Sequence, residues 1–164
     1  MNTPDTFRQL LGVQAEQITR RLSGRPLTDE VAEELALWLN RTHGPASLGY
    51  QTLAQACRDG VAAGWLCNRE GGGIRYGHIF RPADDLQGFS VDVVDMHNTA
   101  GPHHTHPHGE IDLIMPTEGE ALFDGHPAGW WVYPAGSAHH PTVSQGRALV
   151  LYLLPQGAIE FTRA

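Results

Sequence analysis

Residues 101–114 read GPHHTHPHGEIDLI, and this stretch decides how the chain folds. Because side chains two apart in an extended strand point to the same side, His104 and His106 are predicted to point together into a barrel. A tight turn at residues 107–109 then sends the chain back, so Glu110 opens the next strand opposite the two histidines. The stretch therefore predicts two antiparallel strands that carry three possible metal ligands on one face.

A fourth possible ligand lies in the segment PAGSAHHP at residues 134–141, which contains His139 and His140. Three imidazoles and one carboxylate suit a divalent first-row metal such as zinc, iron, manganese, nickel or cobalt, and the residue types do not choose among them. The alternative is a polar barrel lining of hydrogen-bonded histidines. We expect His103, His108 and His140 to lie at the surface or behind the ligands. Their odd or even position along a strand, or their place in a turn, directs their side chains away from the ligand face.

Short strands with frequent turns surround the histidine stretch. From residue 74 onward the apolar residues alternate with polar ones, and turn signals recur about every 8 to 12 residues. This pattern predicts a mostly β fold, either a small antiparallel barrel or a double-sheet jelly roll. The predicted strands are Ile74–Phe80, Phe89–Met96, His103–His106, Glu110–Met115, Ala121–Phe123, Trp130–Tyr133, Ala148–Leu153 and Ile159–Thr162.

The part of the chain before residue 69 has helical spacing instead. Apolar residues recur at intervals of three and four from Thr6 onward, Thr28 is predicted to cap a helix over Asp29–Asn40, and a third helix is expected around Leu48–Ala63. We therefore divide the chain into residues 1–68, an N-terminal helical extension packed on the barrel, and residues 69–164, the β-barrel itself.

The charge composition excludes several classes of function. The 164 residues carry a net charge of -7, and all 11 basic side chains are arginines. The lack of lysine excludes Schiff-base chemistry, a pyridoxal-phosphate lysine and a Walker-type P-loop. The acidic balance argues against nucleic acid or an anionic membrane as a partner and leaves a small metabolite as the expected ligand.

The sequence also predicts a cytoplasmic protein. Its two cysteines are too few for a secreted disulfide framework, and its first residues lack the pattern of a signal peptide. No apolar run approaches the roughly 20 residues that span a bilayer. Apolar edge strands together with the helical extension predict a homodimer.

The histidine motifs resemble the two-part signature of the cupin superfamily, whose fold is a double-stranded β-helix (jelly-roll) barrel. The matching positions are His104-x-His106, Glu110 after three further residues, and Pro134-x-Gly136-x-x-His139. A more specific similarity, over about Gly64 to Phe161, is to the 4-hydroxylaminobenzoate lyases of bacterial nitroaromatic breakdown. The segments that carry it are REGGGIRYG at 69–77, GFSVDVVDM at 88–96, GEIDLIMP at 109–116 and ALVLYLLP at 148–155.

Two further residues are candidates for chemistry beside the metal. Asp112 follows Glu110 by two positions and should share its inward face, where a buried carboxylate is either a general acid or base or a structural hydrogen-bond acceptor. If the substrate is a benzoate, an arginine has to bind its carboxylate, since guanidinium and carboxylate pair in a bidentate way. Arg75, which follows three glycines at the start of a strand, is the preferred anchor, and Arg69 and Arg81 are the alternatives.

The resemblance implies a lyase that converts 4-hydroxylaminobenzoate and water to 3,4-dihydroxybenzoate (protocatechuate) and ammonia. This conversion is redox-neutral, so a divalent metal is needed only as a Lewis acid. Two alternatives stay open. One is an iron-dependent cupin dioxygenase acting on an aromatic acid, because the same ligands serve that chemistry, and the other is a small-molecule-binding cupin module.

Overall fold

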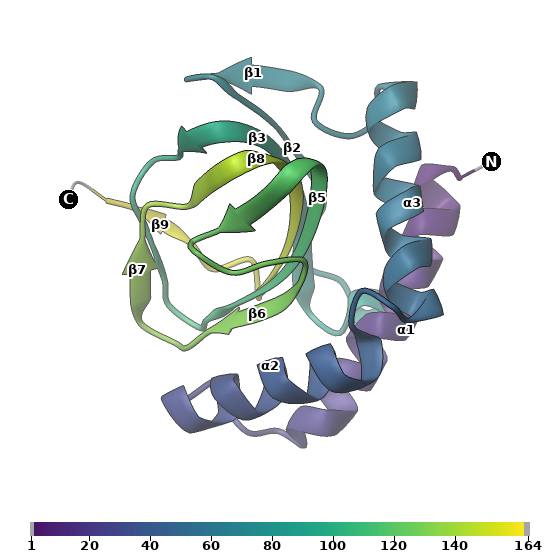
Figure 1. Cartoon of the computed structure of the whole chain (residues 1–164). Coiled ribbons are helices and arrows are strands. Elements are labelled where there is room, and N and C mark those ends of the chain that lie inside the picture. Colours follow the sequence, from purple (N-terminus) through teal and green to yellow (C-terminus); the bar gives the residue numbers. More distant parts are fainter. Residues whose placement is uncertain (1, 163–164) are drawn as a thin grey trace.

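The computed structural model describes residues 2–162, in which three helices lie along the right-hand side and the bottom of a curled β-structure in the view of Figure 1. Each helix starts at a side-chain cap, because Thr3, Thr28 and Ser47 accept a hydrogen bond from a backbone N–H of the first turn. The predicted cap at Thr28 is thus confirmed. The helices are α1 (Pro4–Leu22), α2 (Asp29–His43) and α3 (Leu48–Ala63).

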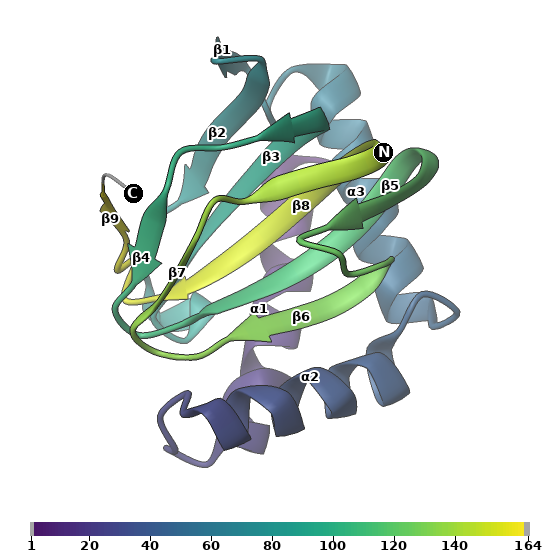
Figure 2. The same cartoon turned by 60° about the vertical axis from the view of Figure 1, so that its left-hand side comes forward.

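The strands form two antiparallel sheets that curl around a common interior (Figures 1 and 2). The larger sheet has the order β1-β2-β3-β8-β5-β6, and the smaller has the order β7-β4-β9. The fold is therefore mostly β with N-terminal helices, as predicted. The strands are β1 (Arg69–Gly71), β2 (Ile74–Phe80), β3 (Phe89–Ala100), β4 (His104–His106), β5 (Glu110–Phe123), β6 (Gly129–Tyr133), β7 (Ser137–His139), β8 (Thr142–Pro155) and β9 (Glu160–Phe161), with a 3-10 turn η1 (Asp84–Leu86) between β2 and β3.

The observed strands differ from the predicted ones in three ways, the first of which is that β3 and β8 extend beyond the predicted Phe89–Met96 and Ala148–Leu153. The two strands predicted over Glu110–Met115 and Ala121–Phe123 are one strand, β5, because register shifts after Pro116 and after Gly119 bend the strand without ending it. The short strands β1 and β7 have no predicted counterpart, since three residues are too few to show an alternating pattern.

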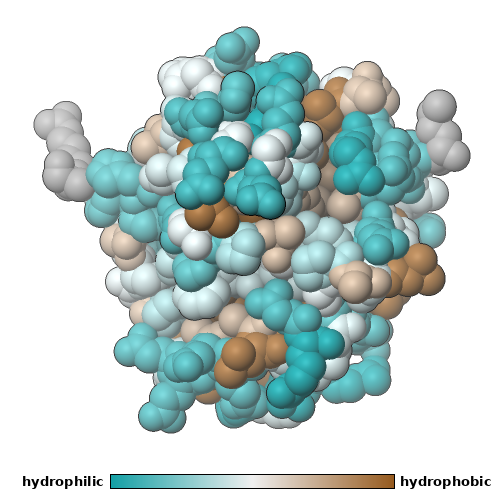
Figure 3. Space-filling model, viewed as in Figure 1, coloured by the Kyte–Doolittle hydropathy of each residue, from teal (hydrophilic) through white to brown (hydrophobic). Residues whose placement is uncertain are grey.

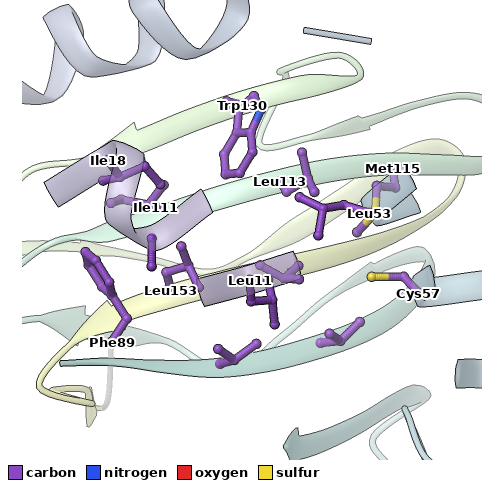
Figure 4. Close-up of a cluster of buried hydrophobic side chains, with 14 of the residues drawn as sticks. Leu11, Ile18, Leu53, Cys57, Phe89, Ile111, Leu113, Met115, Trp130 and Leu153 are labelled. Carbon is purple, nitrogen blue, oxygen red and sulfur yellow. The ribbon is translucent and has the colours of Figure 1, made fainter. Parts of the chain in front are cut away.

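Opposite faces of the larger sheet have different partners. Leu113 of β5 and Leu151 of β8 belong to the hydrophobic cluster that the sheet shares with the helices. Ile114 and Val150, one position away, belong to a second cluster inside the barrel. Because side chains alternate along a strand, this assigns the even-numbered positions within residues 110–114 of β5 and 148–150 of β8 to the interior. Beyond the register shifts of β5, the odd-numbered Ala121 and Phe123 belong to the interior cluster. Figure 4 labels residues of the helix-side cluster from both layers, including Leu11, Ile18, Leu53, Phe89, Ile111 and Trp130.

Hydrogen bonds join the helices to the strands that carry the interior face. The Asn40 side chain donates to the Trp130 carbonyl at 2.8 Å and accepts from the Trp130 N–H at 2.7 Å. The indole N–H of Trp130 donates to the His43 carbonyl at 3.0 Å. The Tyr50 hydroxyl donates to the Ile114 carbonyl at 2.6 Å. The helices thus fix the position of β5 and β6 from outside the barrel.

The domain division, the oligomeric state and the cellular location of the chain stay predictions. One hydrophobic cluster includes residues of the helices and of the sheet, and the division into residues 1–68 and 69–164 stays a prediction. The homodimer and the cytoplasmic location also stay predictions.

Within residues 2–162, no helix has the length and hydrophobicity needed to cross a bilayer. The face seen in Figure 3 is mostly hydrophilic or neutral, with scattered hydrophobic side chains.

Candidate metal centre

Four side chains from three strands converge inside the barrel. His104 and His106 come from β4, Glu110 is the first residue of β5, and His139 is the last residue of β7. One potential ligand atom from each of these residues lies within 4.8 Å of the others. The structure therefore brings together all four predicted metal ligands, which we call the ligand set.

The spacing within the ligand set fits a single ion. The Nε2 atoms of His104 and His139, which face each other across the β4–β7 ladder, are 3.0 Å apart. Glu110 Oε2 lies 3.7 Å from His104 Nε2 and 3.6 Å from His139 Nε2, and it also contacts His106 Nε2. Atoms that each lie about 2.1 Å from one ion are roughly 3 to 3.5 Å from each other, so these distances need little change on binding.

Hydrogen bonds on the far side of two imidazoles direct their Nε2 atoms inward. His104 Nδ1 lies 3.3 Å from the carbonyl oxygen of Pro102, which can only accept, so His104 donates from Nδ1. His106 Nδ1 lies 3.0 Å from the Ser137 hydroxyl, whose own hydrogen is donated to the Pro134 carbonyl at 2.6 Å. His106 therefore also carries its hydrogen on Nδ1, and both Nε2 atoms present a lone pair to the ligand set.

Two buried atoms of the ligand set have no hydrogen-bond partner among residues 2–162, as expected of atoms that bind a cation. They are His106 Nε2 and Glu110 Oε2, which approach each other with lone pairs. Such a contact is unfavourable without a positive charge between the two atoms. Burial raises the pKa of Glu110, but the facing imidazoles outweigh burial and hold that pKa well below its usual value. The residues present thus fit a divalent metal.

A carboxylate that the sequence analysis did not single out orients the third imidazole. Asp124 accepts hydrogen bonds from His139 Nδ1 at 2.5 Å, from the Tyr133 hydroxyl, and from the Thr142 N–H at 2.8 Å. Burial lowers the pKa of His139, but its hydrogen bond to Asp124 and the nearby carboxylate of Glu110 raise that pKa to about 9. The two carboxylates therefore stabilise positive charge at this imidazole, and a cation bound at Nε2 would supply that charge in place of a second proton.

Changing Asp124 to asparagine is expected to weaken metal binding by about 10- to 100-fold, the usual cost of losing a partner behind a ligating histidine. The asparagine amide has the same shape as the carboxylate, but its N–H₂ group cannot accept a hydrogen bond. At least one of the three donors, which are His139, Tyr133 and Thr142, then loses its acceptor, and the orientation of His139 is no longer fixed. Competition with a chelator of known affinity measures the change. The exposed Asp84→Asn is the matched control, and equal affinity in the two variants would show that Asp124 does not hold His139.

Asp112 lies on the same inward face of β5 as Glu110, as predicted. It is fully buried, with 0% of its surface exposed, and neither carboxylate oxygen has a hydrogen-bond partner among the described residues. Burial and then the neighbouring charge of Glu110 raise the pKa of Asp112 well above its usual value. The group is therefore favoured in its neutral, protonated form, beside the ligand set.

A cavity of about 520 Å³ extends from His104 and Glu110 toward solvent. Its wall is mainly apolar, with Tyr152 as a further polar residue. Tyr76 and Phe161, which also line it, are 41% and 67% exposed and so mark its open end. The remaining lining residues are Gly71, Gly72, Ile74, Val94, Met96, Gly101, Pro102, Phe123, Pro141, Val150 and Ile159. A flat aromatic ring fits such a space.

The structure does not bring Arg75 into this wall. Arg75 is exposed on β2 between Ile74 and Tyr76, which both line the cavity, so strand alternation turns its side chain to the opposite face. No arginine within residues 2–162 is part of the lining. An arginine that binds the carboxylate expected of a benzoate would therefore have to reach in from the cavity mouth.

The remaining histidines near the ligand set lie outside it. His103 Nδ1 lies 2.5 Å from the Thr162 hydroxyl, His140 Nδ1 lies 3.3 Å from the Gly101 carbonyl, and His108 is exposed in the turn before β5. None of the three belongs to the metal-binding group of the described residues.

Two curled antiparallel sheets with an inward-facing ligand set define a cupin barrel with a candidate metal centre. A profile of the family described as "PnbB: 4-hydroxylaminobenzoate lyase" matches residues 13–161. The chain therefore belongs to the 4-hydroxylaminobenzoate lyase family, and its enzyme class is that of a lyase, as the sequence resemblance implied.

Individual relatives agree with the family assignment. A 4-hydroxylaminobenzoate lyase of Nocardioides sp. (strain LMS-CY) is 36% identical over 79% of this chain and 82% of its own length. A 4-hydroxylaminobenzoate lyase of Pseudomonas putida is 34% identical over 76% of this chain and 80% of its own length. Among solved structures, an RmlC-like cupin protein from Ralstonia eutropha aligns over 57% of this chain and 62% of its own, with 13% identity and a TM-score of 0.42.

Proposed function

We propose that this chain converts 4-hydroxylaminobenzoate and water to 3,4-dihydroxybenzoate and ammonia. The observation that carries the proposal is the ligand set at the inner end of an apolar cavity, in a chain that belongs to this lyase family. The cavity of about 520 Å³ has room for a benzene ring with its two substituents. The polar hydroxylamino group then lies toward the ligand set and the ring lies among apolar side chains.

His104, His106, Glu110 and His139 are the residues that would hold a divalent metal. When bound there, the metal supplies Lewis acidity toward the hydroxylamino group. The same four ligands suit several divalent first-row metals, among them zinc, iron, manganese, nickel and cobalt.

Asp112 is proposed as the group that supplies a proton at the hydroxylamino oxygen. Its buried, neutral carboxyl group has no other hydrogen-bond partner among the described residues, so its proton is free to be donated. Donation lets the N–O bond break with both electrons leaving on oxygen as water. The ring is left electron-poor, and water adds, with loss of a proton, to the ring carbon adjacent to the one that bears the nitrogen.

The remaining steps balance without an oxidant or a reductant. A second water adds to the resulting imine carbon, ammonia leaves from the carbinolamine, and tautomerisation restores the aromatic ring as a catechol. Two waters enter and one leaves, so the sum is one water consumed and one ammonia released. The apolar cavity wall limits the access of bulk water, which restricts diversion of the electron-poor intermediate.

An assay under strict anoxia tests the proposal against the main alternative. We expect one ammonia and one 3,4-dihydroxybenzoate per 4-hydroxylaminobenzoate consumed, at the same rate with and without oxygen, because no step uses oxygen. Mass spectrometry of the product and enzymatic detection of ammonia measure both yields. A reaction that stops without oxygen would indicate a ring-opening dioxygenase, and tight substrate binding without turnover would indicate a binding module.

A further inference from the structure

The cavity leaves one part of the proposed substrate without a partner. If the hydroxylamino group lies at the ligand set, the carboxylate on the opposite carbon of the ring points toward the cavity mouth. The mouth is bounded by the β1–β2 hairpin, which contributes Gly71, Gly72, Ile74 and Tyr76 to the lining. A cationic side chain on this hairpin would therefore meet the carboxylate.

The register of the hairpin shows which of its arginines faces the cavity. Arg69 is directly opposite Tyr76, and Glu70 is directly opposite Arg75. Residues directly opposite each other in an antiparallel pair point to the same face. Since Tyr76 lines the cavity, Arg69 lies on the cavity side, whereas Arg75 and Glu70 lie on the other side.

The row of directly opposite residues that begins with Arg69 and Tyr76 continues across the larger sheet into the cavity wall. Tyr76 pairs with Val94, and Val94 pairs with Val150, both of which line the cavity. The neighbouring row contains Arg75 and Asp95, and Asp95 is ion-paired with Arg147 at 2.7 Å on the face away from the cavity. The opposite orientations of Arg69 and Arg75 therefore follow from the pairing of three consecutive strands.

Arg69 is also an arginine without an ionic partner in the part of the chain that the structure describes. Arg8 pairs with Asp85, and Arg25 pairs with Glu34, whereas Arg69 is exposed with no ion pair or side-chain hydrogen bond. A free guanidinium beside an apolar cavity suits a planar carboxylate, which it can bind through two parallel hydrogen bonds.

We propose that Arg69 binds the carboxylate of the aromatic substrate at the cavity mouth and so selects a ring with a carboxylate opposite the reacting group. This inference rests on the proposed function for the identity of the substrate. It assigns the role expected of Arg75 to the arginine six positions earlier.

Steady-state kinetics on two substrates test this assignment. For 4-hydroxylaminobenzoate, Arg69→Gln is expected to lower kcat/KM by about 10- to 100-fold, mainly through KM, the usual effect of losing a charged hydrogen-bonded pair. For the neutral 4-hydroxylaminobenzamide, wild type and Arg69→Gln are expected to differ by less than about twofold. The exposed Arg41→Gln on α2 is the matched control, with wild-type kinetics expected on both substrates.

Two results would overturn the assignment. The first is an unchanged kcat/KM of Arg69→Gln on the carboxylate substrate, and the second is a larger loss in Arg75→Gln or Arg81→Gln than in Arg69→Gln. Calorimetric binding of the unreactive 4-hydroxybenzoate by wild type and Arg69→Gln separates this inference from the reaction. If wild type binds this acid but does not turn over the hydroxylamino substrate, the proposed reaction fails, and the binding difference still decides the role of Arg69.

Discussion

Changing His106 to alanine is expected to remove the bound metal and to lower turnover by more than about 100-fold. Losing only the hydrogen-bond partner of a ligating histidine costs up to about 100-fold, so losing the ligand itself should cost more. His106 is completely buried, and its Nε2 contacts Glu110 Oε2 inside the ligand set. Alanine leaves Glu110 without this neighbour and removes one of four ligand positions. Elemental analysis of the purified protein and ammonia release measure the two losses.

A control variant at a histidine outside the ligand set shows whether the loss of metal and turnover is specific to a ligand position. His108 is two positions away and exposed in the turn before β5, so His108→Ala is expected to keep both its metal and its activity. Circular dichroism of His106→Ala shows whether the barrel is intact. Full turnover in a folded, metal-free His106→Ala would remove the metal from the reaction and leave the histidines as acid and base groups.

Changing Asp112 to asparagine is expected to lower kcat by about 10²- to 10⁴-fold, the range associated with a positioned general acid, while the metal content stays at the wild-type level. The amide has the shape of the protonated carboxyl group but cannot deliver its proton. Asp112 is not in the ligand set, so metal binding and turnover should separate in this variant. Glu120→Gln, near the exposed middle of β5, is the control on the same strand.

The stability of the same variant depends on pH in a defined direction. Burial and Glu110 raise the pKa of Asp112 in the folded protein. The wild type therefore gains stability from this group below the unfolded pKa of about 3.9 and loses it as the pH rises through the folded pKa. Asp112→Asn lacks this loss, so its unfolding free energy relative to wild type should rise as the pH is raised above about 4. Unchanged kcat, or a relative stability that falls over this range, would show that Asp112 is not a neutral acid.

The sequence was sufficient to predict three members of the ligand set because the period of a strand is fixed, whereas His139 was predicted from the resemblance to the cupin signature. His104 and His106 are two apart, a turn of three residues reverses the chain, and Glu110 then faces the pair. Alternation also places Asp112 inside correctly. The three helices could be predicted because their spacing of apolar residues is regular and Thr28 provides a clear start signal.

Other parts of the site depend on pairing between strands, which one segment of sequence does not specify. Asp124 reaches His139 from a turn in which it has a left-handed φ of 50° and precedes Gly125. An Asp-Gly pair is a common turn signal, so its role behind a ligand is not visible in the sequence. The face occupied by Arg69 or Arg75 likewise depends on the register of β1, a strand too short to be predicted.

Metal titration of the metal-free protein tests the central claim, that one ion in the ligand set is required for the release of ammonia. With 4-hydroxylaminobenzoate present under anoxia, the rate should rise in proportion to added metal and reach its maximum at one equivalent per chain. His106→Ala should show no such rise. Full ammonia release by wild-type protein that elemental analysis finds free of metal would contradict the claim.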